Sequence, residues 1–372
     1  MSSVPIDSAA GFAKASDPKR HPLGLYFLFA TEMWERYGFY TAAAVMTLYL
    51  QRGGFGWNKS QATTLWSNYL MFVYATPLIG GWVADNFLGY RRSVLIGGGL
   101  FIAGYFTLSL GSPIGFYAAL VLLFAGNGFF KPNISTMVGN LYPQGSPLKD
   151  SAYNIFYMGI NVGALLAPLT AELVLNQTIS KSVYEAAKKG VALTSEQSAS
   201  LRGGFLTVFF LAACGMTLGT LVFAALYRKL AAVDVRHKPV ANDLAYNAAL
   251  DEDLPPRKEV SAIDQVPELT RIVALLVIYA IVVVFWMVFH QNGSTMTYWA
   301  DENTDWPYTG VVSNAINPFW IVVLSIPLVW FWNLLRAMGM EPSTPMKMAL
   351  GMFLTALAFF ILFLGAVHDV RD

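Results

Sequence analysis

Cysteine and charged residues are both scarce in this sequence of 372 residues. Cys214 is the single cysteine, so the chain has neither a disulfide framework nor a cysteine-based metal site. Charged residues make up 13% of the chain, about half of their share in soluble proteins, whereas apolar residues make up 55%. A soluble fold could not cover so much apolar surface with so few charges. Lipid can cover it, and we therefore predict an integral membrane protein.

Signatures of catalysis and of nucleotide binding are missing as well. The sequence has no P-loop of the form GxxxxGK[ST], no G-x-S-x-G nucleophile motif and no His/Cys metal spacing. A net charge of +1 gives no reason to expect a nucleic-acid partner. We therefore expect a protein that is not an enzyme, needs no metal or cofactor, and draws its energy from an ion gradient.

Long apolar runs, in contrast, follow one another along the whole chain. A helix needs about 20 mostly apolar residues to cross the bilayer core. Nine segments qualify: 23–50, 62–85, 93–111, 114–141, 154–176, 203–228, 267–297, 311–338 and 344–368. We predict an all-α polytopic membrane protein with a tail over 1–22, a six-helix bundle over 23–230, a polar linker over 231–266 and the first part of a second helical bundle over 267–372.

Lys and Arg are unevenly distributed among the segments that connect these spans. The short loop with Arg91 and Arg92 and the long linker both fall on the side of the amino terminus. Cytoplasmic segments carry an excess of Lys and Arg, so the amino terminus and the linker are predicted to be cytoplasmic. Residues 1–21 lack the apolar stretch of a signal peptide, and the first span is expected to stay in the mature protein.

The first predicted span carries three charged residues, Glu32, Glu35 and Arg36, within five positions. A charge at the bilayer centre costs at least about 2.5–3.5 kcal/mol, so such residues are rare and usually functional. Glu32 and Arg36 are four residues apart, and all three lie on one helix face. A structural salt bridge accounts for one acid and one base and leaves a carboxylate over. Two acids that share one arginine differ in proton affinity, which favours a proton site.

Lys131 is a second intramembrane charge, and it stands beside Pro132 in a glycine-rich segment. Glycines permit close approach of helices, and the proline opens a backbone hydrogen bond. A lysine at such an irregularity suits an anion, either a carboxylate of the substrate or one of the protein. The alternative is a lysine that reaches out to water from a helix end.

Uncharged polar residues in the spans are less specific signals. Asn161 lies in an apolar span, where hydrogen bonding between helices also explains it. Gln291 follows His290 towards the end of the seventh span, where a helix that frays into water is an equal explanation. Asn317 stands near a helix start, and Tyr74 fits a core position as readily as the wall of a site.

Four segments, in order along the chain, resemble signatures of the proton-dependent oligopeptide transporter family within the major facilitator superfamily. Glu32–Tyr40 is similar to the first-span signature ExxERFxYY, and residues 80–92 are similar to the loop signature after the second span. Gly126–Asn133 matches GxGxxKPN, and Phe156–Gly163 matches FYxxINxG. The resemblance covers essentially the whole chain and is weaker from residue 267 onward.

This resemblance implies a major facilitator fold and the import of di- and tripeptides with protons by alternating access. It implies a monomer in the plasma membrane, the inner membrane of a bacterium, with short peptides, protons and the lipid bilayer as partners. Carried over by position, the resemblance also implies roles for single residues. Proton coupling is assigned to Glu32, Glu35, Arg36 and Lys131. The substrate pocket is assigned to Arg36, Tyr40, Tyr74, Lys131, Asn161, Gln291 and Asn317, and a cytoplasmic gate to Asp85 and Arg91.

The sequence also departs from the family pattern. Phe39 stands where the family often has a tyrosine, and Ala43 stands where many members have a further pocket arginine. His290 and Gln291 occupy the place of an acidic residue in the seventh span. The second bundle has three spans where the family has six, so we expect the sequence to be truncated. A carrier of nitrate or another small acid, and a nutrient sensor built on the same fold, remain alternative functions.

Overall fold

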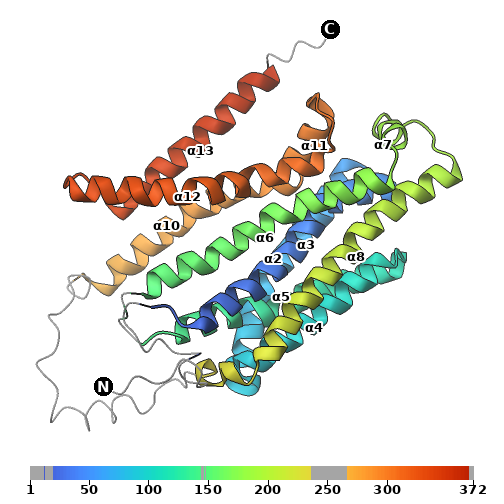
Figure 1. Ribbon diagram of the computed structural model, residues 1–372. Coiled ribbons are helices and arrows are strands. Elements are labelled where there is room, and N and C mark those ends of the chain that lie inside the picture. Colours follow the sequence, from blue (N-terminus) through green and yellow to red (C-terminus); the bar gives the residue numbers. More distant parts are fainter. Residues whose placement is uncertain (1–11, 13–19, 144–145, 147, 236–265, 368–372) are drawn as a thin grey trace, which may run out of the picture. The chain divides into compact units, whose positions relative to one another are not determined.

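The computed structural model describes residues 12, 20–143, 146, 148–235 and 266–367. Almost the whole predicted linker and most of the amino-terminal tail fall outside these residues. Within them, the regular structure is helical (Figure 1). The longer helices are α2 (Leu23–Leu48), α3 (Lys59–Val83), α4 (Tyr90–Ser109), α5 (Pro113–Asn140), α6 (Lys149–Thr178), α8 (Ser195–Leu226), α10 (Glu268–Phe289), α12 (Ser313–Ala337) and α13 (Thr344–Val367).

Shorter helical segments connect or extend these helices. They are η1 (Tyr49–Gly54), η2 (Ala84–Leu88), α7 (Lys181–Lys188), η3 (Lys229–Val233), η4 (His290–Gly293), α11 (Thr295–Asn303) and η5 (Gly310–Val312). The predicted seventh span over 267–297 is too long, since α10 ends at Phe289 and a new helix, α11, begins at Thr295. The polar run His290–Ser294 between them has non-helical backbone at Ser294, with φ −138° and ψ −85°.

Seven helices of the described part are long and apolar enough to cross a membrane. They are α4, α5, α6, α8, α10 with η4, η5 with α12, and α13. The helices α2 and α3 lie at predicted spans but do not meet the same test. Every stretch of 18 residues in α2 contains all three charges of the predicted proton site, and α3 begins with a run of polar residues. Composition alone therefore does not establish nine spans.

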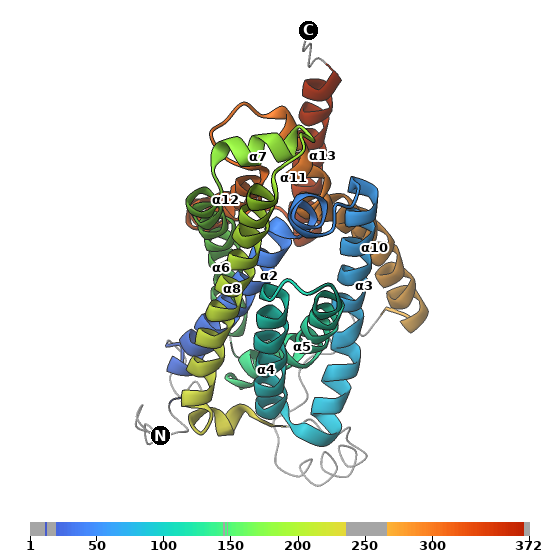
Figure 2. The same cartoon turned by 90° about the vertical axis from the view of Figure 1, so that its right-hand side faces the viewer.

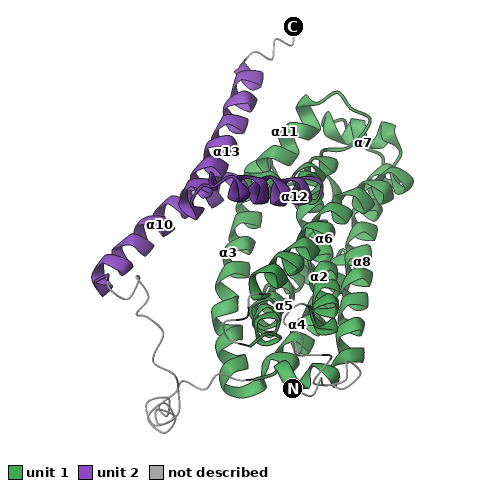
Figure 3. Cartoon of the chain, turned by 60° about the vertical axis from the view of Figure 1, so that its left-hand side comes forward, with its two compact units in different colours: residues 1–256, 291–322 green, residues 257–290, 323–372 purple. Residues whose placement is uncertain are grey.

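The described chain divides into two compact units, coloured separately in Figure 3. Unit 1 comprises residues 1–256 and 291–322, and unit 2 comprises residues 257–290 and 323–372. The boundary crosses α12, whose first ten residues belong to unit 1. Unit 1 holds almost all the buried residues. The helices α10 and α13 of unit 2 have no buried residue.

Within unit 1, α2 packs along both α6 and α8 (Figure 2). Glycines on these neighbours allow the close approach. A Cβ atom at Gly163 of α6 would come within 2.4 Å of the Met33 carbonyl oxygen, and one at Gly215 of α8 within 2.5 Å of the Tyr37 ring. Because both flanks of α2 are covered in this way, its charged side chains are buried inside unit 1.

The helices α3 and α5 meet through glycines, and this contact gives a direct test of the packing. A Cβ atom at Gly80 would lie 2.0 Å from the Gly128 carbonyl oxygen, whereas one at the neighbouring Gly81 would make an ordinary contact of 3.7 Å with Pro132. Overpacking of this kind typically costs about 1–3 kcal/mol. Gly80→Ala is expected to lower the thermal unfolding temperature in detergent clearly more than the control Gly81→Ala. Equal melting temperatures would contradict the close approach.

The turn between α12 and α13 in unit 2 is organised by Glu341. Arg336 and Lys347 each contact its carboxylate with a nitrogen–oxygen distance of 2.6 Å. Hydrogen bonds from these two cations lower the pKa of Glu341 to about 2, so its carboxylate is ionised at neutral pH.

Candidate functional site

The three charges of α2 form one buried cluster. Arg36 Nε lies 3.0 Å from Glu32 Oε1 and 2.5 Å from Glu35 Oε2. The three residues expose only 1% to 3% of their surface. One guanidinium therefore faces two carboxylates in an environment where each charge is costly. The predicted shared arginine is present in the structure.

Hydrogen bonding in this cluster is incomplete. Arg36 Nε donates to Glu32 Oε1. The contact with Glu35 lacks hydrogen-bond geometry, and neither oxygen of Glu35 has a hydrogen-bond donor among the described residues. Glu32 Oε2 and Arg36 Nη2 also have no partner there. Buried polar groups are nearly always paired, so Glu35 and Arg36 are left with hydrogen-bonding capacity that the described residues do not use.

Lys131 approaches the cluster from α5. Its side chain is within coulombic range of Arg36, Glu35 and Glu32, and its Nζ lies 5.5 Å from the ring centroid of Tyr74 on α3. Among the described residues it has no ion-pair partner within 4.0 Å. Its ammonium group thus lies over an aromatic ring and in the neighbourhood of the two carboxylates.

Two of the predicted pocket tyrosines belong to the same group of side chains. Tyr40 and Tyr74 are both within coulombic range of Arg36. Tyr40 is half-buried one helical turn after Arg36, and Tyr74 exposes 52% of its surface. The guanidinium carbon of Arg36 lies 5.4 Å from the ring centroid of Phe39. The aromatic rings of Phe39, Tyr40 and Tyr74 thus lie near the positive end of the cluster.

The other predicted pocket residues lie outside this group. Asn161 donates to the Tyr157 carbonyl oxygen of its own helix at 2.9 Å. Gln291 is exposed and accepts a hydrogen bond from Thr295 at 2.6 Å. Asn317 is exposed near the start of α12. Their assignment to the pocket therefore stays a prediction from the family resemblance.

The residues of the predicted gate are not paired with each other. Arg91 contacts Asp234, with Nε 3.0 Å from Oδ2, and donates to the Tyr227 carbonyl oxygen at 2.8 Å. Asp85 is exposed in η2. Asp234 also accepts hydrogen bonds from the backbone N–H groups of Tyr90 and Arg91. It therefore caps the start of α4 as well as neutralising Arg91, which explains why Arg91 turns towards it.

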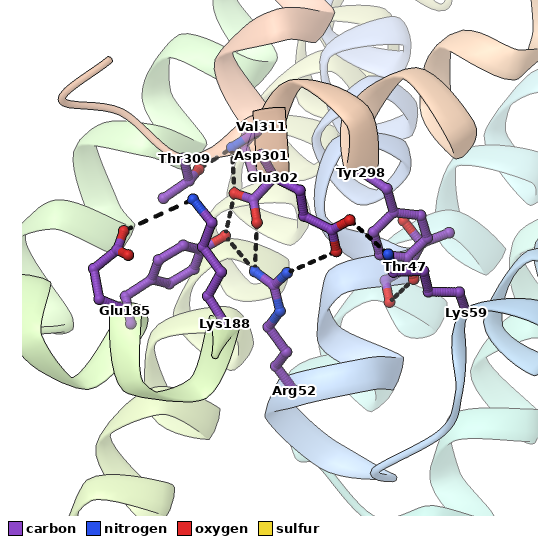
Figure 4. A network of polar contacts seen from close by, with 12 residues as sticks. Thr47, Arg52, Lys59, Glu185, Lys188, Tyr298, Asp301, Glu302, Thr309 and Val311 are labelled. Atoms are coloured by element: carbon purple, nitrogen blue, oxygen red, sulfur yellow. Dashed lines mark hydrogen bonds and ion pairs between the residues drawn. The ribbon is translucent and has the colours of Figure 1, made fainter. Parts of the chain in front are cut away.

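A second buried polar network, which the sequence analysis did not predict, joins the segment 291–312 to the rest of unit 1 (Figure 4). Arg52 donates to Asp301 at 2.7 Å and to the hydroxyl of Tyr184 at 3.0 Å. Tyr184 and the backbone N–H of Gly310 both donate to Asp301 Oδ1, at 2.9 and 2.7 Å. Burial and the Asp301 carboxylate raise the pKa of Tyr184 well above its ordinary value, so its hydroxyl remains a donor.

Further hydrogen bonds hold the segment 291–312 against the rest of unit 1. Both oxygens of Glu172 on α6 accept from Thr309, one from its N–H at 2.9 Å and one from its hydroxyl at 2.5 Å. The hydroxyl of Tyr298 donates to the Thr47 carbonyl oxygen at 2.9 Å. Glu172 is a carboxylate inside a predicted span, and the cost of such a charge could have identified it in the sequence. Arg52 carried no such signal, because loop arginines are common.

Burial determines how much each of these ion pairs contributes to the stability of the fold. The pair Arg52–Asp301 exposes 4% and 1% of its side chains, whereas Lys59–Glu302, with a contact of 2.6 Å, exposes 48% and 32%. Removing one partner of a buried pair costs about 3–5 kcal/mol, and an exposed pair contributes about 0–1 kcal/mol. Arg52→Ala is thus expected to lower the thermal unfolding temperature strongly, and the control Lys59→Ala only slightly.

A double variant separates the charge from other effects of the substitution. In Arg52→Ala with Asp301→Asn, the amide oxygen still accepts from Gly310 and Tyr184, but no unpaired charge remains. We expect it to regain most of the lost stability. A double variant as unstable as Arg52→Ala would show that lost packing, rather than the ion pair, causes the effect.

Neither network has the composition of a metal site. In the part of the chain that the structure describes, no group of three or more His, Cys, Asp or Glu side chains could hold a metal ion.

Comparison with known proteins links this geometry to one family of transporters. The sequence pattern of the POT family matches residues 91–250 and 252–371. The uncharacterized transporter YclF of Bacillus subtilis is 30% identical over 396 residues, which cover 94% of this chain and 75% of YclF. A di-/tripeptide transporter of Lactococcus lactis subsp. lactis is 28% identical over 386 residues, which cover 92% of this chain and 75% of that protein.

Solved structures give the same result. A crystal structure of a variant of peptide transporter POT in complex with alafosfalin superposes with a TM-score of 0.72 at 26% identity. The match covers 99% of this chain and 79% of that one. A crystal structure of peptide transporter POT in complex with sulfate superposes with a TM-score of 0.68 at 27% identity, over 99% of this chain and 80% of that one.

Proposed function

Because the chain belongs to the POT family of transporters, we propose that it is a proton-coupled symporter that imports di- and tripeptides by alternating access. The observation that carries the proposal is the buried cluster on α2, in which one guanidinium serves two carboxylates. The peptide substrate is supported by relatives named as di-/tripeptide transporters.

The charge balance of the cluster favours a proton as the coupled ion. Glu32 and Glu35 carry two negative charges against one positive charge on Arg36, and Glu35 lacks a hydrogen-bond donor among the described residues. A proton on Glu35 removes one of the two negative charges that face Arg36 and so weakens the hold on its guanidinium. The guanidinium can then bind another carboxylate. Proton binding and substrate binding are thereby linked through a single side chain.

The peptide carboxylate is proposed to bind between Arg36 and Lys131. Arg36 Nη2 has no hydrogen-bond partner among the described residues, and Lys131 makes only its aromatic contact with Tyr74 there. Two cations close to one carboxylate favour short peptides with a free carboxyl end. Tyr40 and Tyr74 would form the walls of this end of the pocket. Asn161, Gln291 and Asn317 are proposed to line it in other conformations of the protein.

We propose nine spans for this sequence, in which α2 and α3 also cross the bilayer. The charged face of α2 is covered by protein on all sides, so its low hydropathy does not prevent insertion. The amino terminus is proposed to be cytoplasmic in a bacterial inner membrane. The network around Arg52 and Asp301 then lies at the outer end of unit 1, and Arg91 and Asp234 lie at the cytoplasmic end, where Asp85 is proposed to take part in gating.

Purified protein in liposomes provides the test. A labelled dipeptide is expected to accumulate when the outside is acidic and to equilibrate only when a protonophore is added. An unlabelled dipeptide should compete, and the same dipeptide with an amidated carboxyl end should compete poorly. Accumulation that continues unchanged in the presence of the protonophore would contradict the proposal. Competition by nitrate instead of dipeptide would identify a carrier of small acids, and binding without uptake would identify a sensor.

A further inference from the structure

Tyr105 on α4 has a buried hydroxyl group that the proposed mechanism does not yet use. The residue is fully buried, with 0% of its surface exposed. Its hydroxyl has no hydrogen-bond partner among the described residues. A buried tyrosine hydroxyl usually finds such a partner. Its neighbours therefore decide what this group does.

The ring of Tyr105 lies directly against the charged helix. A Cβ atom at Gly38 would be 3.0 Å from Tyr105 Cε2 and 3.5 Å from its hydroxyl oxygen. Gly38 is three residues after Glu35, and side chains at this spacing are neighbours with about 5–6 Å between Cβ atoms. The hydroxyl thus lies one helical turn from Glu35, on a place that only glycine leaves open.

Tyr69 on α3 is a second buried tyrosine in the region of Glu35 and Tyr105. It exposes 6% of its surface and is within coulombic range of Glu35, and Tyr105 is within coulombic range of both. Glu35, meanwhile, has two buried oxygen atoms without a donor among the described residues. Two phenol groups, one from α3 and one from α4, therefore lie in the region of the carboxylate that is proposed to carry the proton.

The other groups around Glu35 are already engaged or uncharged. On its own helix it faces Glu32, Arg36 and Tyr40, and Lys131 faces it from α5. The helices α6 and α8 also pack against α2, and they contact it through glycines such as Gly163. Tyr105 on α4 and Tyr69 on α3 thus add two neutral donors to this region, besides Tyr40 on α2 itself.

We propose that Tyr105 is a positioning residue for Glu35, supported by Tyr69, and this inference rests on the proposed proton coupling. Its hydroxyl donates a hydrogen bond to the ionised Glu35 carboxylate, directly or through one water molecule, when the contact with Arg36 is released. A donor to the ionised form favours that form. Tyr105 thereby helps Glu35 to release its proton and to return to the empty state.

Tyr105→Phe tests this role, because it removes the hydroxyl and keeps the ring against Gly38. Loss of a hydrogen bond to a charged group changes a protonation equilibrium about tenfold. The midpoint of proton-driven dipeptide uptake against external pH is expected to move about one unit to more alkaline pH. Driven uptake should fall relative to peptide exchange, which needs no proton release. Tyr69→Phe should move the midpoint in the same direction by less.

Tyr37→Phe is the matched control. Tyr37 lies on α2 and is similarly buried, but its hydroxyl is 2.9 Å from the Thr170 hydroxyl on α6. Its removal should leave the pH midpoint unchanged. An unchanged midpoint in Tyr105→Phe, or an equal shift in Tyr37→Phe, would overturn the role of Tyr105 while wild-type uptake remained proton-driven. Wild-type protein without proton-driven uptake would overturn the proposed function itself.

Discussion

Glu35→Gln is expected to abolish accumulation of dipeptide in liposomes, reducing uptake to its level without a proton gradient. Glutamine has nearly the shape of a protonated glutamic acid but cannot bind or release a proton. Glu35 is the carboxylate without hydrogen-bond donors among the described residues, and it lies 2.5 Å from the shared guanidinium. The variant should therefore resemble the loaded state permanently. Exchange of labelled for unlabelled dipeptide across the membrane is expected to continue.

Comparing proton-driven uptake with peptide exchange separates a loss of proton coupling from a loss of peptide binding or movement. Glu185→Gln is a suitable control, because Glu185 lies on α7 away from the cluster, its side chain is 41% exposed, and its contact with Lys188 is a distant 4.0 Å. It should retain driven uptake. A Glu35→Gln protein that still accumulates dipeptide would remove Glu35 from the coupling mechanism. Loss of exchange as well would indicate that the variant no longer binds or moves peptide.

Arg36→Ala is expected to have the largest effect on stability. It leaves Glu32 and Glu35 buried together without their cation, and uncompensated burial of this kind costs about 3–5 kcal/mol. The thermal unfolding temperature in detergent should fall steeply, and peptide binding should be lost with it. Lys131 cannot replace the arginine, because its single ammonium group is positioned by the Tyr74 ring.

A combined variant separates stability from function at this position. Arg36→Ala with Glu32→Gln and Glu35→Gln removes all three charges of α2 and leaves Lys131, which lies over the Tyr74 ring, as the neighbouring charge from α5. Most of the stability should return. Transport should not return, since both the proton site and the carboxylate site are gone. Recovery of proton-driven uptake by this variant would refute the assignment of either function to the cluster. Failure to recover stability would show that the arginine acts mainly through packing.

The helical pattern and the charged centre could be predicted from local features of the chain. Each apolar run of about 20 residues has one stable conformation in lipid, because only a helix satisfies its own backbone hydrogen bonds. The three charges of α2 are neighbours by helical spacing alone. The end of the seventh span was predicted wrongly, because hydropathy does not register the break of backbone conformation at Ser294.

Contacts between distant residues could not be predicted in the same way. Asp85 and Arg91 are close in sequence and opposite in charge, yet Arg91 pairs with Asp234, which also caps α4. Tyr105 had no feature that distinguished it from other aromatic residues in a span. Its importance depends on Gly38, which allows its ring to lie one turn from Glu35.

The sequence by itself determined that the chain is a helical membrane protein with the charged residues Glu32, Glu35 and Arg36 on one face of its first long helix. Composition and helical spacing suffice for this, because both act within a single segment. Only the tertiary structure decided that Arg52 meets Asp301, that Arg91 meets Asp234, and that Tyr105 lies near Glu35. Such contacts depend on which helices pack together and how closely their glycines let them approach, and no local pattern encodes that.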